Sequence, residues 1–405
     1  MATAFLDVVA AIVMNDDHQP FVELADRIWD VIVIGAGPAG GMSALRAARA
    51  GHSVLLVEAK RFPRDKVCGG CLNARAWQVL EQHRLSDTLL SAGAVTLDRL
   101  RLSCGARAAH WRMPSMFAVS RSLLDQTILD AAVAAGAVFS GSTQAKVIAV
   151  DNEQAQVQLR SKSHGEAAVR ARIIVAADGL NHSSLSELDW PAGRIDPDSR
   201  IGIGASLVAD ATSYPAGELT MAVGRGGYVG ITRVEENLLR IAAAVSPKLI
   251  RSCGSPAATV KHLLEFNRLP VPAALMSGDF HGTLPMTRTN PQLAGTRLFL
   301  LGDATGYVEP FTGEGMSWAL AGAVELSPIL STAVHEWHTE LIDQWQQIWT
   351  RRVRGHRRTC GSLAWLLRRP RLAAAALVGT GAPWAVRKLM TDISGQSAPA
   401  LSLES

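Results

Sequence analysis

The sequence predicts an α/β protein whose main domain is a Rossmann-like, mostly parallel sheet covered by helices. The first of three observations is an apolar strand at 30–34 that runs directly into a G-x-G-x-x-G segment at 35–40. The second is another apolar strand at 53–57. The third is a pair of later strands, at 172–177 and 297–301, each followed at once by glycine and aspartate. Strands separated by helical segments in this way form doubly wound sheets.

The glycine-rich segment predicts a dinucleotide site. Gly35 allows the tight turn after the strand, Gly37 lets a pyrophosphate approach the backbone, and Gly40 lets the next helix lie close to the strand. The helix N-terminus offers free N–H groups and a partial positive charge to the phosphates. Glu58 follows Gly40 by 18 residues and is placed to accept hydrogen bonds from the ribose hydroxyls. Its charge would repel a 2′-phosphate, so the sequence predicts FAD or NAD rather than NADP.

The two later strand ends favour FAD over NAD. Asp178 and Gly179 follow one strand, and Gly302 and Asp303 follow the other. Parallel strands bring their carboxyl ends to one edge of a sheet, where ligands bind. A carboxylate at that edge can accept hydrogen bonds from a sugar-alcohol chain, and FAD carries a ribityl chain that runs on past the pyrophosphate. The three signatures together therefore predict FAD.

The segments at 35–40, 178–179 and 302–316 resemble the geranylgeranyl reductase-like FAD-dependent oxidoreductases, a branch of the aromatic-hydroxylase (group A flavin monooxygenase) superfamily. The resemblance covers roughly 29–330. Its most specific part is the last motif, Gly-Asp-Ala-Thr-Gly-Tyr-Val-Glu-Pro-Phe-Thr-Gly-Glu-Gly-Met. The resemblance implies that Asp303 binds the ribityl chain of FAD.

The same resemblance implies that residues 310–315 wrap the isoalloxazine and that the loop at 66–70 passes close to it. A Gly-x-Gly pair before the helix expected at 316–326 also leaves backbone N–H groups aimed outward, and these would stabilise the negative charge of reduced flavin. The further positions expected beside the cofactor are Pro310, Gly313, Gly315, Arg121, Lys66 and Cys68.

Cys68 and Cys71 form a C-x-x-C motif, which taken alone would indicate a redox dithiol or half a zinc site. The sequence has no second C-x-x-C, and its other three cysteines are isolated, so we expect no metal site. Two interpretations of the pair remain open. Either thiol could take part in redox chemistry beside the flavin, or both could be structural residues of the loop.

A second dinucleotide fingerprint is absent. In the glycine-rich segment at 224–230, Val229 occupies the position that a third glycine would need. NAD(P)H would therefore act as a transient electron donor, unless another donor serves. The apolar residues at 227–230 and the alternating pattern at 238–245 predict sheet. We expect this sheet to line a substrate cavity over the flavin, with Tyr228 among the lining residues.

The expected function is electron transfer through FAD to or from an apolar small molecule, with C=C reduction ahead of hydroxylation. The residues at 313–317 differ from the Gly-Gln-Gly-x-Asn of the aromatic hydroxylases, and the chain lacks the Trp-x-Trp of the halogenases. Two alternatives stay open. One is a monooxygenase that uses NAD(P)H and O₂, and the other is a non-enzymatic flavin electron-transfer protein.

Composition places the chain among globular proteins. Of its 405 residues, 48% are hydrophobic and 19% charged, which excludes a disordered or fibrous protein. Five cysteines in so long a chain make no disulfide framework, so we expect a cytoplasmic protein. The uncharged run at 372–386 is shorter than a spanning helix and contains glycine and proline, and we expect no transmembrane segment.

The C-terminal region is basic and rich in tryptophan. Residues 344–391 hold ten of the 40 Lys and Arg and none of the 36 Asp and Glu. Such a segment could contact the inner face of an anionic membrane. Alternatively, the tryptophans pack on the body while the arginines stay in water, which base rates favour. Nothing here resembles a nucleic-acid motif. The tryptophans concerned are Trp345, Trp349, Trp365 and Trp384.

These patterns predict a discontinuous FAD domain at 29–180 and 282–330, with a mostly antiparallel β substrate domain inserted at 181–281. An extension at 1–28 precedes them, and a helical region at 331–405 follows. One long helix is expected over 333–353, because apolar residues there recur at helical spacing. Its buried stripe would be Trp337, Leu341, Trp345 and Ile348.

Overall fold

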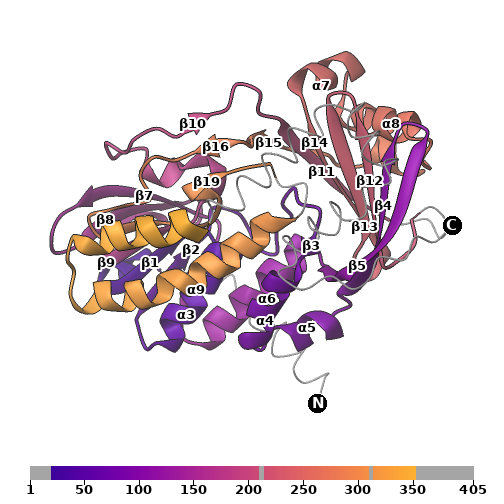
Figure 1. Cartoon of the computed structure of the whole chain (residues 1–405). Helices are drawn as coiled ribbons and strands as arrows, with labels where there is room; N and C mark the ends of the chain where they lie inside the picture. The colour runs from indigo at the N-terminus through magenta and orange to yellow at the C-terminus, as the bar shows by residue number, and fades with distance from the viewer. Residues whose placement is uncertain (1–19, 209–213, 310–312, 353–405) are drawn as a thin grey trace.

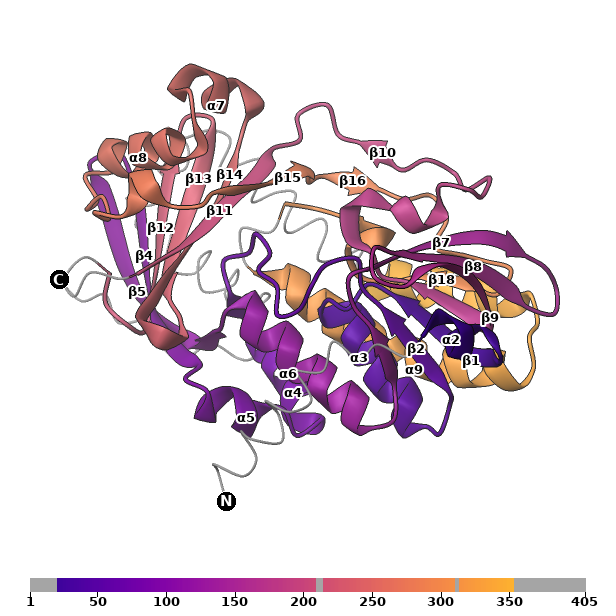
Figure 2. The same cartoon turned by 180° about the vertical axis from the view of Figure 1, so that it is seen from behind.

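The computed structural model describes residues 20–208, 214–309 and 313–352. Two large sheets lie at opposite sides of the molecule, and a small sheet lies between them (Figure 1; Figure 2). The small sheet consists of β10 (Arg194–Ile195), β16 (Arg288–Thr289) and β19 (Gly306–Tyr307).

The first large sheet has eight strands in the order β17-β18-β9-β1-β2-β6, with β8 paired to β9 and β7 paired to β8. Its parallel strands are β1 (Ile28–Ile34), β2 (Val54–Val57), β6 (Val138–Ser140), β9 (Gly165–Ala176) and β18 (Leu298–Leu300). Its antiparallel members are β7 (Thr143–Val150), β8 (Ala155–Ser161) and β17 (Ala294–Gly295). The predicted Rossmann-like α/β domain is thus confirmed.

Helices cover one face of this sheet, and the β7-β8 arm with a short N-terminal helix covers the other. The apolar cores on the two faces are separate, and the central strands β1 and β2 are buried between them. The helices are α2 (Phe21–Ala25), α3 (Pro38–Arg49), α4 (Ala74–Gln82), α5 (Ser86–Ser91), α6 (Arg121–Ala134) and α9 (Glu314–His335).

Helix α9 is long and apolar enough to cross a membrane by length and composition. However, 72% of its most apolar window is buried inside the protein, where it packs against α3 and α4. Its hydrophobicity is therefore that of a core helix, which needs no lipid to cover its apolar side chains.

The second large sheet also has eight strands, in the order β15-β11-β14-β13-β12-β4-β5-β3. All neighbouring strands whose pairing is described are antiparallel except β4 and β12. Helices α7 (Pro247–Cys253) and α8 (Pro256–Phe266) follow β14, and α8 packs on one face. The strands are β3 (Cys71–Leu72), β4 (Val95–Cys104), β5 (Arg107–Ala118), β11 (Ile201–Val208), β12 (Glu218–Gly224), β13 (Gly227–Arg233), β14 (Leu238–Val245) and β15 (His281–Pro285).

The second sheet differs from the predicted inserted domain at 181–281. Strands β3, β4 and β5 come from 71–118, inside the segment assigned to the FAD domain, and β15 extends four residues past 281. Both sheets are therefore built from separated segments of the chain. The sequence pattern of a strand indicates which residues are buried, but it does not specify which distant strand supplies the hydrogen bonds.

The single helix expected over 333–353 is wrong. Helix α9 ends at His335, Glu336 has an extended backbone, and residues 340–352 form a separate helix. On that helix Leu341 and Trp345 are buried as predicted, while Ile348 is only half-buried and Trp349 takes the buried position.

Two of the four C-terminal tryptophans belong to the core. Trp345 is fully buried and donates a hydrogen bond from Nε1 to the carbonyl of Leu300 at 3.1 Å. Trp349 is 2% exposed and packs over Gly322 of α9. Trp365 and Trp384 lie outside the described residues, as does the predicted helical region beyond 352. Trp345 and Trp349 thus pack on the body, and the choice between the two alternatives for the basic region as a whole stays a prediction.

Candidate functional site

The glycine-rich loop after β1 is packed so tightly that its glycines cannot be replaced freely. Gly35 has φ +100°, and a Cβ there would lie 2.5 Å from the carbonyl oxygen of Ala177. A Cβ on Gly40 would lie 1.8 Å from the carbonyl oxygen of Gly35. These contacts join the start of α3 to the ends of β1 and β9, as the predicted roles of the two glycines require.

Gly37 is different, because a Cβ there would meet no backbone. Its nearest neighbours would be Nη2 of Arg64 at 3.4 Å and Nη2 of Arg121 at 3.5 Å. Gly37 is the N-cap of α3, and no side chain of the described residues caps that helix. Two guanidinium groups and free N–H groups therefore face the same small space, which suits a pyrophosphate.

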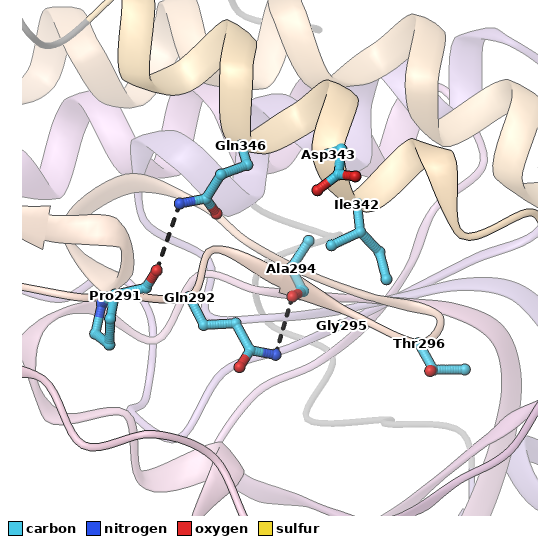
Figure 3. Close-up of a pocket in the computed structure, with 8 residues that line it drawn as sticks. All are labelled: Pro291, Gln292, Ala294, Gly295, Thr296, Ile342, Asp343 and Gln346. Atoms are coloured by element: carbon cyan, nitrogen blue, oxygen red, sulfur yellow. Dashed lines mark hydrogen bonds between the residues drawn. The ribbon is translucent and has the colours of Figure 1, made fainter.

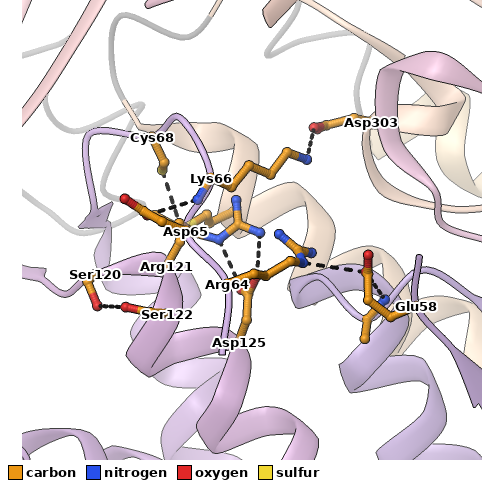
Figure 4. A network of polar contacts seen from close by, with 12 residues as sticks. Glu58, Arg64, Asp65, Lys66, Cys68, Ser120, Arg121, Ser122, Asp125 and Asp303 are labelled. Atoms are coloured by element: carbon orange, nitrogen blue, oxygen red, sulfur yellow. Dashed lines mark hydrogen bonds and ion pairs between the residues drawn. The ribbon is translucent and has the colours of Figure 1, made fainter. Parts of the chain in front are cut away.

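The two arginines are held by buried carboxylates (Figure 4). Arg121 donates from Nε and Nη2 to the two oxygens of Asp125 at 2.9 and 2.7 Å, and both side chains are at least 95% buried. Arg64 lies 3.5 Å from both Asp125 Oδ2 and Glu58 Oε2. Burial alone would lower the pKa of Arg121, but the charge and hydrogen bonds of Asp125 outweigh it and raise that pKa. Arg121 therefore stays charged.

Glu58 lies at the end of β2, where the sequence predicts a ribose-binding acid. Its Oε2 accepts a hydrogen bond from the backbone N–H of Ala36 at 3.0 Å, and its Oε1 accepts one from Lys60 at 2.9 Å. The side chain is 7% exposed. The first of these bonds ties the carboxylate directly to the glycine-rich loop, in the position expected for contact with the adenosine half of the dinucleotide.

Asp178 and Gly179 follow β9 at the same edge of the sheet. Oδ2 of Asp178 accepts a hydrogen bond from the N–H of Ser184 at 2.9 Å, whereas Oδ1 is buried with no hydrogen-bond partner in the part of the chain that the structure describes. Gly179 has φ +80°, and its open side faces the ammonium of Lys66. A buried carboxylate oxygen of this kind needs a donor, and a ligand hydroxyl would supply one.

Asp303 lies in the short 3₁₀ turn Gly302–Thr305 that follows β18. A Cβ on Gly302 would lie 2.8 Å from the Cβ of Ala39, so this turn touches the first turn of α3. Nζ of Lys66 lies 3.6 Å from Asp303 Oδ2. The structure thus brings Asp303, Lys66 and the glycine-rich loop together from distant parts of the sequence.

The motif that the resemblance places around the isoalloxazine is described only in part, because Pro310 lies outside the described residues. Gly313 has φ +72° and precedes α9, and a Cβ on it would lie 3.2 Å from the carbonyl oxygen of Cys71. A Cβ on Gly315 would lie 3.3 Å from the ring of Tyr307. The start of α9 is therefore close to the C-x-x-C loop, as the resemblance implies.

The two cysteines of that loop have different surroundings. Sγ of Cys68 is half-buried and lies 3.9 Å from Sδ of Met316 at the start of α9. Cys71 is buried, and burial raises the pKa of its thiol to about 12. Cys71 is therefore protonated at neutral pH and a poor nucleophile. Cys71 is thus suited to a structural role, and a redox role for Cys68 stays a prediction.

Tyr228 is 5% exposed and faces the cofactor domain from β13. It contacts Glu309, and the guanidinium of Arg200 lies 5.5 Å from the centre of its ring. Arg200 in turn donates from Nη1 to Glu309 Oε1 at 2.8 Å, and both of these side chains are buried. Burial, followed by the charge of Glu309, raises the pKa of Tyr228. That Tyr228 lines a substrate cavity stays a prediction.

A surface cleft of about 440 Å³ lies elsewhere, between the β17-β18 hairpin and the helix at 340–352 (Figure 3). It lies at the β17 edge of the first sheet, and strands β18 and β9 separate that edge from β1, which leads into the glycine-rich loop. None of the predicted site residues lines it. The residues that line it are Pro291, Gln292, Ala294, Gly295, Thr296, Ile342, Asp343 and Gln346.

Within the described ranges, no group of three or more His, Cys, Asp or Glu side chains could hold a metal ion. The site is instead an array of arginines, a lysine and carboxylates along the carboxyl edge of the first sheet. The residues expected there from sequence, apart from Pro310 and Tyr228, lie at this edge or in the loops packed against it: Gly35, Gly37, Gly40, Glu58, Lys66, Cys68, Arg121, Asp178, Gly179, Gly302, Asp303, Gly313 and Gly315.

Sequence reasoning missed the partners that hold these residues. Asp125 could have been found, because it follows Arg121 by four positions, and residues at that spacing are neighbours on a helix such as α6. Arg64 lies only two residues before Lys66 in the same loop. Glu235 and Arg240 of the second sheet had no local signal, because the site residues that they contact lie more than a hundred positions away.

The comparisons with known proteins agree with this geometry. Residues 29–203 match the FAD binding domain family. Menaquinone reductase from Mycobacterium tuberculosis (strain ATCC 25618 / H37Rv) is 29% identical, over 73% of this chain and 74% of that protein. Digeranylgeranylglycerophospholipid reductase 1 from Methanopyrus kandleri is 26% identical, over 80% of this chain and 87% of that protein. The solved structure of the flavin-dependent brominase Bmp2 superposes with a TM-score of 0.74 at 18% identity, covering 90% of this chain and 93% of that one.

The fold and the site therefore define an FAD-dependent oxidoreductase. The FAD binding domain family matches 29–203, and the two sequence relatives named above are named as reductases, in agreement with the predicted resemblance to the geranylgeranyl reductase-like branch. The residues present fit FAD. A Cβ on Gly37 would meet two arginine side chains, and the buried Oδ1 of Asp178 has no hydrogen-bond donor among the described residues.

Proposed function

We propose that this protein reduces C=C double bonds in an apolar substrate that carries an isoprenoid chain. The relatives that support this assignment are named for menaquinone and for digeranylgeranyl lipids. Both kinds of molecule contain polyisoprenyl chains, so a shared substrate class would be an unsaturated hydrocarbon chain rather than a polar headgroup. When bound, FAD would supply the hydride for this chemistry.

The observation that carries the proposal is the character of the second sheet on its side facing the FAD domain. The buried apolar side chains on that side form one cluster that includes four methionines. Methionine is flexible and polarisable, so such a surface can adapt to a long, irregular hydrocarbon chain and exclude water. The large apolar side chains of this cluster are Leu97, Leu100, Trp111, Met113, Met116, Met221 and Met286.

Different residues of the chain would bind the cofactor and orient the substrate. Arg64 and Arg121 would hold the pyrophosphate, and Asp178 and Asp303 would hold hydroxyl groups of FAD. The methionine-rich face would orient the hydrocarbon. Reduction of one double bond consumes a hydride and a proton, and NAD(P)H would reload the flavin as a transient donor.

The test is anaerobic incubation of the FAD-loaded protein with NAD(P)H or dithionite and two probes, a menaquinone and geranylgeraniol. Mass spectrometry should detect products that have gained two hydrogens per reduced bond. A product that gains an oxygen atom, only in air, would instead identify a monooxygenase. FAD that cycles with an artificial acceptor and leaves both probes unchanged would contradict the proposal and favour an electron-transfer protein.

A further inference from the structure

The hairpin β13-β14 of the second sheet carries two buried charged residues that point out of their own sheet. Arg240 is 2% exposed and Glu235 is 8% exposed. Charged side chains are rarely buried unless they are paired, because removing them from water is costly. Both of these side chains find their partners in the elements that form the FAD site.

Arg240 holds the loop between β2 and β3. Its Nη1 donates to the carboxylate of Asp65 and to Ser206, and its Nη2 donates to the carbonyl oxygens of Lys66 at 2.9 Å and Cys68 at 3.3 Å. A planar guanidinium can bond two backbone carbonyls and a carboxylate at once, which fixes the conformation of the loop.

Thr232 of the same hairpin adds another bond, from Oγ1 to the carbonyl of Gly69 at 3.1 Å. The loop held in this way places Nζ of Lys66 3.6 Å from Asp303. It also places Sγ of Cys68 against Met316 at the start of α9. Attachment of the loop to the second sheet therefore determines where these two side chains stand relative to the cofactor elements.

Glu235 acts on the other half of the site. Its carboxylate accepts a hydrogen bond from the backbone N–H of Ser120 at 3.0 Å, and Ser120 is the N-cap of α6. Arg121 is the first residue of that helix. A negative charge at a helix N-terminus is stabilising, and here it also fixes the end of the helix from which Arg121 projects toward Gly37.

The turn that presents Glu235 is itself strained. Glu236 and Asn237 have φ of +56° and +57°, a left-handed conformation that side-chain-bearing residues rarely adopt. The hairpin closes around it with a bond from the N–H of Val234 to the carbonyl of Leu238 at 2.9 Å. Strained turns persist where the surrounding contacts over-determine them, which is consistent with a specific anchoring role for Glu235.

We propose that Glu235 and Arg240 are positioning residues through which the second sheet holds Arg121 and Lys66 in their cofactor-facing places. The second sheet is then a required part of the FAD site, although no residue of the hairpin belongs to an FAD-binding motif. The proposal concerns FAD binding and is independent of the substrate, so a failed search for substrate leaves it standing.

The first test is the dissociation constant for FAD, measured by quenching of flavin fluorescence on titration with protein stripped of FAD. Loss of hydrogen bonds to a charged group should weaken FAD binding about tenfold or more in both Arg240→Gln and Glu235→Gln. Arg99→Gln is the control. Arg99 lies on β4 of the same sheet, pairs with Asp98 and donates to the carbonyl of Ala216, so its replacement should change the constant by less than about twofold.

The second test needs no FAD. Alkylation of Cys68, followed by peptide mapping, should become faster in Arg240→Gln because the loop is released. Cys71 should stay unlabelled, because its pKa of about 12 keeps the thiol protonated. Arg240→Lys keeps the charge beside Asp65 but cannot bond two carbonyls in a fork, so it should restore FAD binding only in part.

The proposal is overturned if Arg240→Gln and Glu235→Gln both fold and bind FAD as the parent does. If Arg240→Gln does not fold, Arg240→Lys and Glu235→Gln decide the question by the same measurements.

Discussion

Replacement of Gly37 by alanine should separate FAD binding from folding. Gly37 has φ −76°, which alanine adopts readily, and an added Cβ would make only ordinary contacts with two arginine side chains. Alanine is a poorer N-cap than glycine by less than about 1 kcal/mol, and it stabilises by about 0.4–1 kcal/mol through lower unfolded-state entropy. The two effects offset each other. The free energy of unfolding without FAD should therefore change by less than about 1 kcal/mol.

FAD binding should respond very differently. The methyl group would occupy the space between the backbone and the guanidinium groups of Arg64 and Arg121, where the pyrophosphate must approach. Loss of one charge-assisted hydrogen bond costs about 1.5–3 kcal/mol, which corresponds to an affinity about 10- to 150-fold lower. Flavin fluorescence quenching gives the dissociation constant, and urea unfolding gives the stability of the protein without FAD.

Two further variants make the comparison decisive. Gly40→Ala would place a Cβ 1.8 Å from a backbone oxygen, so it should lower stability by about 3 kcal/mol or more. In Gly282→Ala the new Cβ has no neighbour nearer than 3.9 Å, so this variant should bind FAD as the parent does. If Gly37→Ala binds FAD with parental affinity, or loses as much stability as Gly40→Ala, the assignment of the pyrophosphate to Gly37 is refuted.

Three other variants probe the site and the fold. Asp125→Asn removes the charge that pairs with the buried Arg121 and should lower the free energy of unfolding in urea by about 3 kcal/mol. Glu166→Gln removes the exposed pair with Arg160 and should lower it by less than about 1 kcal/mol. Equal losses in the two variants would contradict the buried pairing. Burial alone would raise the pKa of Asp65, but the charge and hydrogen bond of Arg240 outweigh it and lower that pKa. The parent should therefore be more stable than Asp65→Asn by a constant amount between about pH 5 and 7, and this difference should shrink as the pH falls below about 4. A difference in stability that does not depend on pH would count against the Asp65–Arg240 pair. Trp345→Ala should cost about 3–5 kcal/mol by thermal or urea unfolding, and a cost near zero would mean that the helix at 340–352 does not pack as described.

The cofactor motifs could be predicted from the sequence because each depends on contacts between residues that are near one another in the chain. Gly35 and Gly40 are needed for a turn that starts and ends within one βα unit, so their spacing alone is informative. Asp178 and Asp303 were found because each directly follows an apolar strand, and parallel strands deliver their carboxyl ends to one edge. Arg121, Lys66 and Cys68 were predicted only from the resemblance, because the residues around them show neither a glycine spacing nor a strand end that would predict a site.

Strand pairing and buried charge partners could not be predicted in the same way. Strands β3 to β5 have the local pattern of any half-buried sheet, and only the pairing of β4 with β12 assigns them to the second sheet. The break after His335 was missed because apolar residues continue at helical spacing through it. In both cases the deciding free energy comes from packing against distant segments, which no local window contains.

The sequence by itself determined the class of cofactor and the chemistry at the edge of the first sheet, because glycine spacing and strand-terminal acids act over a few residues. The tertiary structure alone decided how that edge is held in place. Arg240 and Glu235 reach the predicted FAD loops from the second sheet, and Trp345 and Trp349 are buried against β18 and α9. Such contacts depend on which segments the folded chain brings together, and the residues involved are far apart in sequence.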